Sequence, residues 1–284
     1  MIEARPSATA QRVAMRRAAH QIIDTPRVFD DPLALRILGE KAAADLRSSA
    51  EKLQDSALRS LRAFLVARSR FAEDELAGAV SRGASQYVIL GAGLDTFAYR
   101  NPFAESALRV FEVDYPATQL WKQRLLAEAG ITIPSSLSYA PVDFEHQTLA
   151  DGLAQAGFDP QKITFFSWLG VTPYLTRAAV MSTFAYIAST PPGGSVVFDY
   201  AVPRSTLGLL GRLAFDALAR RVASAGEPFQ TFFDPQDLAT ELPRAGFCQL
   251  EDLDANAINS RYFKDRADGL KVRGSLGHLM SAKI

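Results

Sequence analysis

Residues 86–100 read QYVILGAGLDTFAYR, and the rest of the chain is organised around this stretch. The run from Tyr87 to Leu90 is apolar and rich in bulky and β-branched residues, which is typical of a strand buried inside a parallel sheet. Gly91 and Gly93 then allow a sharp turn, and without a Cβ they let a ligand approach main-chain N–H groups. Asp95 follows where a helix would begin, so these N–H groups would point at a nucleotide-like ligand. The third glycine of the dinucleotide fingerprint is absent, which makes the motif a weak signal by itself.

A carboxylate ends the next predicted strand, which covers residues 108–113. This carboxylate belongs to Asp114, which stands 21 positions after Gly93. In nucleotide-binding α/β proteins, an acid at this place and spacing accepts hydrogen bonds from the ribose hydroxyls. Pro116 favours a helix start directly afterwards, so helix capping is the alternative role for Asp114. The glycine turn before it favours the ribose role.

Strands and helices alternate through the following part of the chain. Further strands are predicted at residues 137–142, 163–168 and 195–200, with helices between them. This rhythm predicts an α/β fold with a doubly wound, mostly parallel sheet. Late strands at residues 247–253 and 277–284 have no strong helical pattern between them, so we expect an antiparallel last strand. A helical insertion is expected near residues 203–233.

A long helical segment precedes the first strand. Helices are predicted at about residues 7–23, 32–38 and 57–80, from capping residues at their starts and from apolar residues at helical spacing. A helical segment of this size suggests a lid over the ligand-binding end of the sheet. We therefore expect a helical cap in residues 1–85 and a Rossmann-like core in residues 86–284.

Composition narrows the class of protein. The 284 residues include 31 Lys+Arg and 31 Asp+Glu, and this balance argues against a nucleic acid or an acidic membrane as the main partner. The single cysteine, Cys248, has no partner for an internal disulfide, which fits a reducing compartment. No apolar leader and no uncharged apolar run of about 18 residues is present. We expect a soluble, cytoplasmic protein. The sequence does not predict its oligomeric state.

Several ordered motifs together resemble one known family. They are LGAGLDTFAYR, FEVDYP, PVDF and WLGVTPYLT, behind an opening SATAQRVAMRRAAHQ and VFDDPLA. The chain resembles, over nearly its whole length, the S-adenosylmethionine-dependent methyltransferases of the leucine carboxyl methyltransferase and polyketide O-methyltransferase type. The resemblance implies a class I methyltransferase fold, in which the seventh strand is antiparallel and an N-terminal helical cap covers the sheet. It does not specify a substrate.

The resemblance also implies a set of cofactor-binding residues. By their matching positions, these are Arg68, Gly91, Gly93, Asp95, Asp114, Asp143 and Phe144. Gly91, Gly93 and Asp95 would lie along the methionine portion of S-adenosylmethionine. Asp114 would bind the ribose, and Asp143 with Phe144 would frame the adenine. Arg68 would grip the methionine carboxylate with its planar fork of N–H donors, whereas without the resemblance it would be read as an exposed helix arginine.

The chain departs from the family pattern at two positions. Phe97 stands where many relatives have arginine, and Leu169 stands where glutamate is common. That glutamate lies near the amino group of the cofactor and the methyl acceptor, so Leu169 is a candidate substrate-side residue. Tyr174, in the loop after the fourth strand, is another such candidate, and a core role for it is equally consistent with the sequence.

The implied reaction needs little from the protein. A sulfonium methyl group is already electrophilic, and transfer requires an acceptor in line with water kept out. We expect O-methylation of a carboxylate or hydroxyl on a small, largely apolar molecule. No catalytic residue is assigned, and no His, Cys or Asp cluster has the spacing of a metal site. Two alternatives stay open: an NAD-dependent oxidoreductase, and a protein that binds S-adenosylmethionine without transferring its methyl group.

Overall fold

The central sheet has seven strands in the order β3-β2-β1-β4-β5-β7-β6. The computed structural model describes residues 7–49, 54–103, 107–143, 147–224 and 226–284. The strands are β1 (Gln86–Leu90), β2 (Arg109–Asp114), β3 (Leu137–Pro141), β4 (Thr164–Trp168), β5 (Ser195–Ala201), β6 (Gln249–Leu253) and β7 (Gly277–Lys283). Strand β7 pairs antiparallel with both β5 and β6, while the pairs among β1 to β5 are parallel. The predicted α/β fold and its antiparallel last strand are confirmed.

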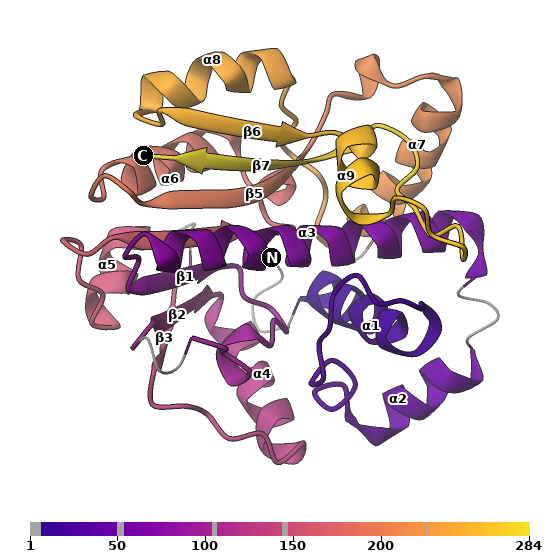
Figure 1. Ribbon diagram of the computed structural model, residues 1–284, viewed down its shortest axis with the longest axis horizontal. Coiled ribbons are helices and arrows are strands. Elements are labelled where there is room, and N and C mark those ends of the chain that lie inside the picture. Colours follow the sequence, from indigo (N-terminus) through magenta and orange to yellow (C-terminus); the bar gives the residue numbers. More distant parts are fainter. Residues whose placement is uncertain (1–6, 50–53, 104–106, 144–146, 225) are drawn as a thin grey trace.

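Helices cover both faces of this sheet (Figure 1). The α-helices are α1 (Ala8–Ile23), α2 (Gly39–Ser48), α3 (Ser56–Ser81), α4 (Pro116–Glu128), α5 (Leu149–Gln155), α6 (Arg177–Ala188), α7 (Leu209–Ala223), α8 (Pro235–Ala245) and α9 (Ala255–Tyr262). Short 3-10 turns are η2 (Phe97–Tyr99), η4 (Thr172–Tyr174) and η5 (Arg204–Thr206). Among the described residues, no helix is long and apolar enough to span a membrane.

Alternation along the strands divides the core into two layers. Side chains of a strand point alternately to the two faces of the sheet. In β1, Tyr87 and Ile89 therefore belong to one buried cluster, and Val88 and Leu90 belong to the other. Because every residue of β1 is buried, the strand lies at the centre of the sheet, as its apolar run predicts.

Helix α3 forms part of the first core layer. Its residues Val66, Ala67 and Phe71 share a buried cluster with Tyr87 and Ile89 of β1. Figure 1 shows α3 running along the sheet, with α1 and α2 beyond one side of it. Helix α3 thus packs directly on the sheet, while α1 packs on α2 and α3. The division into a cap of residues 1–85 and a core of residues 86–284 stays a prediction.

The structure corrects three local predictions. Residues 32–38 form consecutive turns, not a helix, although Oδ1 of Asp31 accepts the Leu33 N–H as an N-cap would and Oδ2 accepts the Thr96 hydroxyl. The loop after Gly93 leads into the single 3-10 turn η2 and not into an α-helix. Helix α9 lies between β6 and β7, where no helical pattern was strong. It is short, and its N-cap is Asp254.

Candidate functional site

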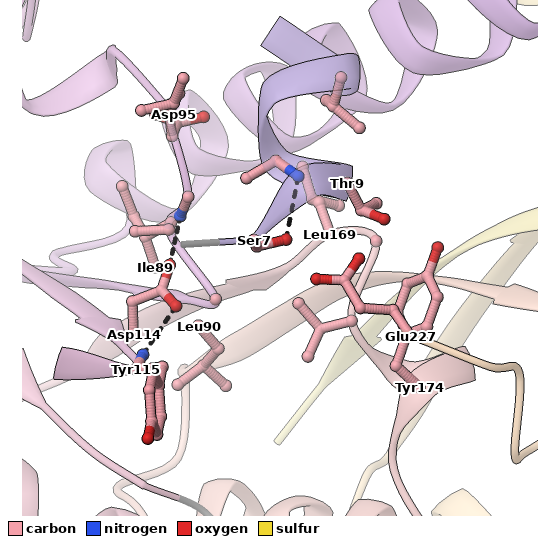
Figure 2. Close-up of a pocket in the computed structure, with 18 of the residues that line it drawn as sticks. Ser7, Thr9, Ile89, Leu90, Asp95, Asp114, Tyr115, Leu169, Tyr174 and Glu227 are labelled. Atoms are coloured by element: carbon pink, nitrogen blue, oxygen red, sulfur yellow. Dashed lines mark hydrogen bonds between the residues drawn. The ribbon is translucent and has the colours of Figure 1, made fainter. Parts of the chain in front are cut away.

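A cavity of about 510 Å³ opens at the carboxyl ends of β1, β2 and β4 (Figure 2). Residues at these strand ends form its floor, as expected for a doubly wound sheet. Helix α1 contributes residues from Ser7 to Arg17 to the wall, and residues 226–230, which follow α7, form another part of it. The volume lies in the range of sites for ligands of nucleotide size.

Eight of the nine residues predicted from the sequence line this one cavity. They are Arg68, Gly91, Gly93, Asp95, Asp114, Asp143, Leu169 and Tyr174. The ninth, Phe144, lies outside the described residues. These residues come from five separate parts of the chain. Their individual roles toward a ligand stay predictions.

Glycine is needed at positions 91 and 93 for a reason that the sequence alone does not show. Gly91 has φ +68° and Gly93 has φ +48°, both in the left-handed region that favours glycine. A Cβ on Gly91 would lie 2.3 Å from Cγ2 of Val171, and one on Gly93 would lie 3.0 Å from Cβ of Ala10. The space that these glycines leave is therefore filled by protein neighbours, including helix α1.

Asp114 connects the glycine turn to the end of β2. Its Oδ2 accepts a hydrogen bond from the Gly93 N–H at 2.5 Å, and its Oδ1 accepts one from the Tyr115 N–H at 2.7 Å. The side chain is partly open to the cavity, yet the surrounding protein excludes much of the water. Burial raises the pKa of Asp114 to about 6, against the lowering effect of these two hydrogen bonds. The carboxylate is thus fixed in place at the cavity floor.

Asp95 and Arg17 connect the glycine turn to α1. Asp95 accepts a hydrogen bond from the Phe97 N–H at 2.7 Å, and its Oδ2 lies 3.6 Å from Nη1 of Arg17. Arg17 also donates to the Leu94 carbonyl at 2.8 Å and lies 3.2 Å from the buried Asp31 carboxylate. Burial would raise the pKa of Asp95, but the charge of Arg17 and other nearby groups hold it below its usual range. Arg17 cannot be recognised as a site residue from the sequence, because nothing there distinguishes it from an exposed helix arginine.

Arg68 is buried, with 6% of its surface exposed, so it is not an exposed helix arginine. Its Nη1 donates to Oδ2 of Asp199 on β5 at 2.8 Å. Asp199 also accepts a hydrogen bond from the Gly170 N–H. The guanidinium packs so closely on Gly170 that a Cβ there would lie 2.8 Å from it. The sequence analysis missed Asp199, although an acid inside the apolar strand SVVFDY is a signal for a buried charge.

Tyr174 and Leu169 form the wall opposite Asp114 in Figure 2, together with Glu227. The Tyr174 ring packs 5.3 Å from the Phe229 ring, centroid to centroid. Burial raises the pKa of Tyr174 to about 12, so its hydroxyl stays protonated at neutral pH. Glu227 was not predicted from the sequence, since an acid in a loop is usually a solvated surface residue.

The strand order and a ligand cavity at the strand carboxyl ends define a class I methyltransferase fold. A structure with this fold is a crystal structure from Thermobifida fusca YX, described as a candidate methyltransferase. It has 17% sequence identity, covers 99% of this chain and 96% of its own, and superposes with a TM-score of 0.58. At this identity the likeness concerns the fold alone.

Sequence relatives specify the family. The family model described as "Leucine carboxyl methyltransferase" matches residues 10–188. YktD of Bacillus subtilis (strain 168), provisionally named as an S-adenosyl-L-methionine-dependent methyltransferase, is 36% identical over 98% of both chains. A provisionally named methyltransferase of this type from Saccharopolyspora erythraea is 31% identical over 72% of this chain and 70% of its own. The chain belongs to the leucine carboxyl methyltransferase family, and its cofactor is S-adenosylmethionine.

The residues of the cavity fit this cofactor. The family assignment confirms the predicted cofactor and decides against the NAD-dependent alternative. S-adenosylmethionine carries a carboxylate, an ammonium group and a ribose. The cavity offers the guanidinium of Arg68 and the carboxylate of Asp114 as complementary groups, in a volume of about 510 Å³.

Proposed function

We propose that the protein transfers the methyl group of S-adenosylmethionine to a carboxylate or hydroxyl oxygen of a small, largely apolar molecule. The observation that supports this proposal is the mixed lining of one cavity. Asp114 and Arg68 supply polar groups for the cofactor, while Val13, Val171 and Leu175 give the remaining wall an apolar character. An apolar wall favours an acceptor that buries hydrocarbon there.

Each polar residue has a proposed binding role. Asp114 would accept hydrogen bonds from the ribose hydroxyls. Arg68 would donate to the methionine carboxylate, because the bond to Asp199 uses only one of the five N–H donors of a guanidinium. Asp143, at the end of β3, would face the adenine. These contacts would hold the cofactor in one orientation relative to the apolar wall.

The chemistry then depends on position more than on acid–base catalysis. Bound S-adenosylmethionine supplies an electrophilic methyl group on a positively charged sulfur. The acceptor oxygen must lie in line with it at about 3–3.5 Å. Helix α1 and residues 226–230 enclose the cavity, and so would keep water from competing. A carboxylate acceptor is ionised at neutral pH and needs no base, which fits a site without an assigned catalytic residue.

A methyl-transfer assay tests this proposal. The protein is incubated with S-adenosylmethionine labelled on the methyl group and with pairs of carboxylic acids and phenols that share an apolar skeleton. We expect label in an ester or ether product, and less label with Asp114→Ala at the same subsaturating cofactor concentration. Bound cofactor with no transfer to any acid or phenol would contradict the proposal and favour a protein that only binds the cofactor.

A further inference from the structure

Glu227 differs from the other carboxylates that line the cavity. The oxygens of Asp114 accept main-chain N–H groups, and Asp95 is bonded to Phe97 and lies near Arg17. Asp143 also has an interaction partner. In contrast, Oε2 of Glu227 is buried and has no hydrogen-bond partner among the residues that the structure describes. A carboxylate oxygen shielded from water in this way is costly unless a ligand pairs with it.

Glu227 is held in position to meet a ligand. Its main-chain N–H donates to the Val222 carbonyl at 3.1 Å, which ties it to the end of α7. In Figure 2 its carboxylate points into the cavity beside the Tyr174 ring. Tyr174 lies within electrostatic reach of both Glu227 and Arg68. Glu227 also lies within electrostatic reach of Asp114, so the free acid faces the same cavity as both the buried guanidinium and Asp114.

The positive charges in the cavity wall do not satisfy Glu227. Arg17 pairs with Asp31 and Asp95, and Arg68 pairs with Asp199. Any hydrogen-bond donor would satisfy the free oxygen of Glu227, and a donor that also carries positive charge would do so most strongly. A sulfonium has charge but no donor, and a hydroxyl has a donor but no charge. An ammonium group has both.

We propose that Glu227 binds the α-ammonium group of S-adenosylmethionine, while Arg68 binds its carboxylate. An amino-acid group carries both charges on one carbon, so its recognition requires an acid and a base that border one space. Glu227 and Arg68 form such a pair from elements far apart in the sequence, the segment after α7 and helix α3. The assignment rests on the proposed cofactor orientation, with the amino-acid end of the cofactor toward Arg68.

Calorimetric titration with two ligands tests the assignment. S-adenosylhomocysteine contains the amino-acid group, and 5′-methylthioadenosine lacks it but keeps the nucleoside and sulfur. We expect Glu227→Gln to weaken S-adenosylhomocysteine binding about tenfold, which corresponds to about 1.4 kcal/mol. Glu227→Leu, which also removes the acceptor oxygen, is expected to weaken it further. The affinity for 5′-methylthioadenosine stays unchanged in both variants.

The control is Asp216→Asn, which removes an exposed carboxylate on α7 that pairs with Arg204 outside the cavity. Thermal melts of each variant establish that it is folded. Unchanged S-adenosylhomocysteine affinity in both Glu227 variants would overturn the assignment and place the carboxylate toward the acceptor. An equal loss for both ligands would also overturn it, because the contact would then lie on the nucleoside side. Absence of S-adenosylhomocysteine binding in the unaltered protein would instead refute the proposed function itself.

Discussion

Asp114 illustrates how one side chain serves both the fold and the site. Its carboxylate fastens the Gly93 turn and also faces the cavity. We expect Asp114→Ala to weaken S-adenosylhomocysteine binding at least tenfold, because charge-assisted hydrogen bonds to the ribose are worth about 1.5–3 kcal/mol each. Isothermal titration calorimetry measures this loss. Equal affinity in Asp114→Ala and the unaltered protein would place the ribose elsewhere in the cavity.

The pKa of Asp114 predicts a dependence of cofactor affinity on pH. In the folded protein this pKa is raised to about 6, above its ordinary value, so the free site favours the protonated acid below that pH. Ribose hydroxyls bond best to the ionised form, so affinity should rise as the pH increases through about 6. Titrations between pH 5 and 7.5 should show this rise, and Asp114→Asn should flatten it. A rise of the same size in Asp114→Asn would assign the effect to another group.

Leu169 gives a third prediction at this scale. The side chain lines the cavity, at the position where the family resemblance implies glutamate. We expect Leu169→Glu, added to the Glu227→Leu variant, to restore part of the S-adenosylhomocysteine affinity, because a carboxylate next to an ammonium group that has lost its partner offsets much of the cost of its own burial. Leu169→Gln is the matched uncharged control. Unchanged affinity when Leu169→Glu is added to a folded Glu227→Leu variant would show that residue 169 does not face the amino-acid end of the cofactor.

Among the elements, α1 and α3 are joined by a buried ionic cluster. Oδ2 of Asp24, which follows α1, accepts a hydrogen bond from Nε of Arg62 at 2.7 Å, and its Oδ1 accepts one from Nη2 at 2.9 Å. Nδ1 of His20 donates to Asp24 at 2.8 Å, because its Nε2 accepts the Val28 N–H. Although burial acts to raise the pKa of Asp24, hydrogen bonds from His20 and Arg62 outweigh it and lower this pKa to about 2. The cluster therefore depends on an ionised carboxylate.

We expect Asp24→Asn to lower the free energy of unfolding by about 3–5 kcal/mol, because it removes the negative charge that pairs with the buried Arg62 guanidinium. The stabilisation by Asp24 should be complete above about pH 4 and should be lost as the pH falls toward 2, since its folded pKa is depressed. Urea denaturation at pH 7 measures the difference. Asp30→Asn, in an exposed pair with Arg27, is the control and should change stability little. A similar small effect for Asp24→Asn would show that the cluster is not stabilising.

Features that depend on neighbouring residues could be predicted from the sequence, whereas features that depend on contacts between distant residues could not. The strands were predicted because their apolar runs are local, and α1, α6 and α8 because Ser7, Thr176 and Asp234 cap them. The helix predicted at residues 32–38 was wrong, and Asp31, its expected cap, also bonds to Thr96, 65 positions away. Asp199 and Glu227 were not predicted as site residues, because their importance depends on residues that are distant in sequence. Most of the eight cavity residues were predicted from the family resemblance. An argument from spacing alone predicts only Asp114 and the glycines.

At the scale of the molecule, the cavity exists because three parts of the chain meet. The strand ends provide its floor, α1 crosses above the glycine turn, and residues 226–230 close another side. The ion pairs of Arg17 and the contact of Ala10 with Gly93 hold α1 there. Ligand binding should therefore stabilise the whole fold, because it bridges elements from both ends of the chain.

The most direct test of the central claim is the melting temperature of the protein with S-adenosylhomocysteine and, separately, with NAD. A ligand at one hundred times its Kd adds about 2.7 kcal/mol of stability. For a chain of this length, this corresponds to an increase of roughly 5–10 °C. We predict an increase of this size with S-adenosylhomocysteine and none with NAD. An increase with NAD and none with S-adenosylhomocysteine would contradict the account.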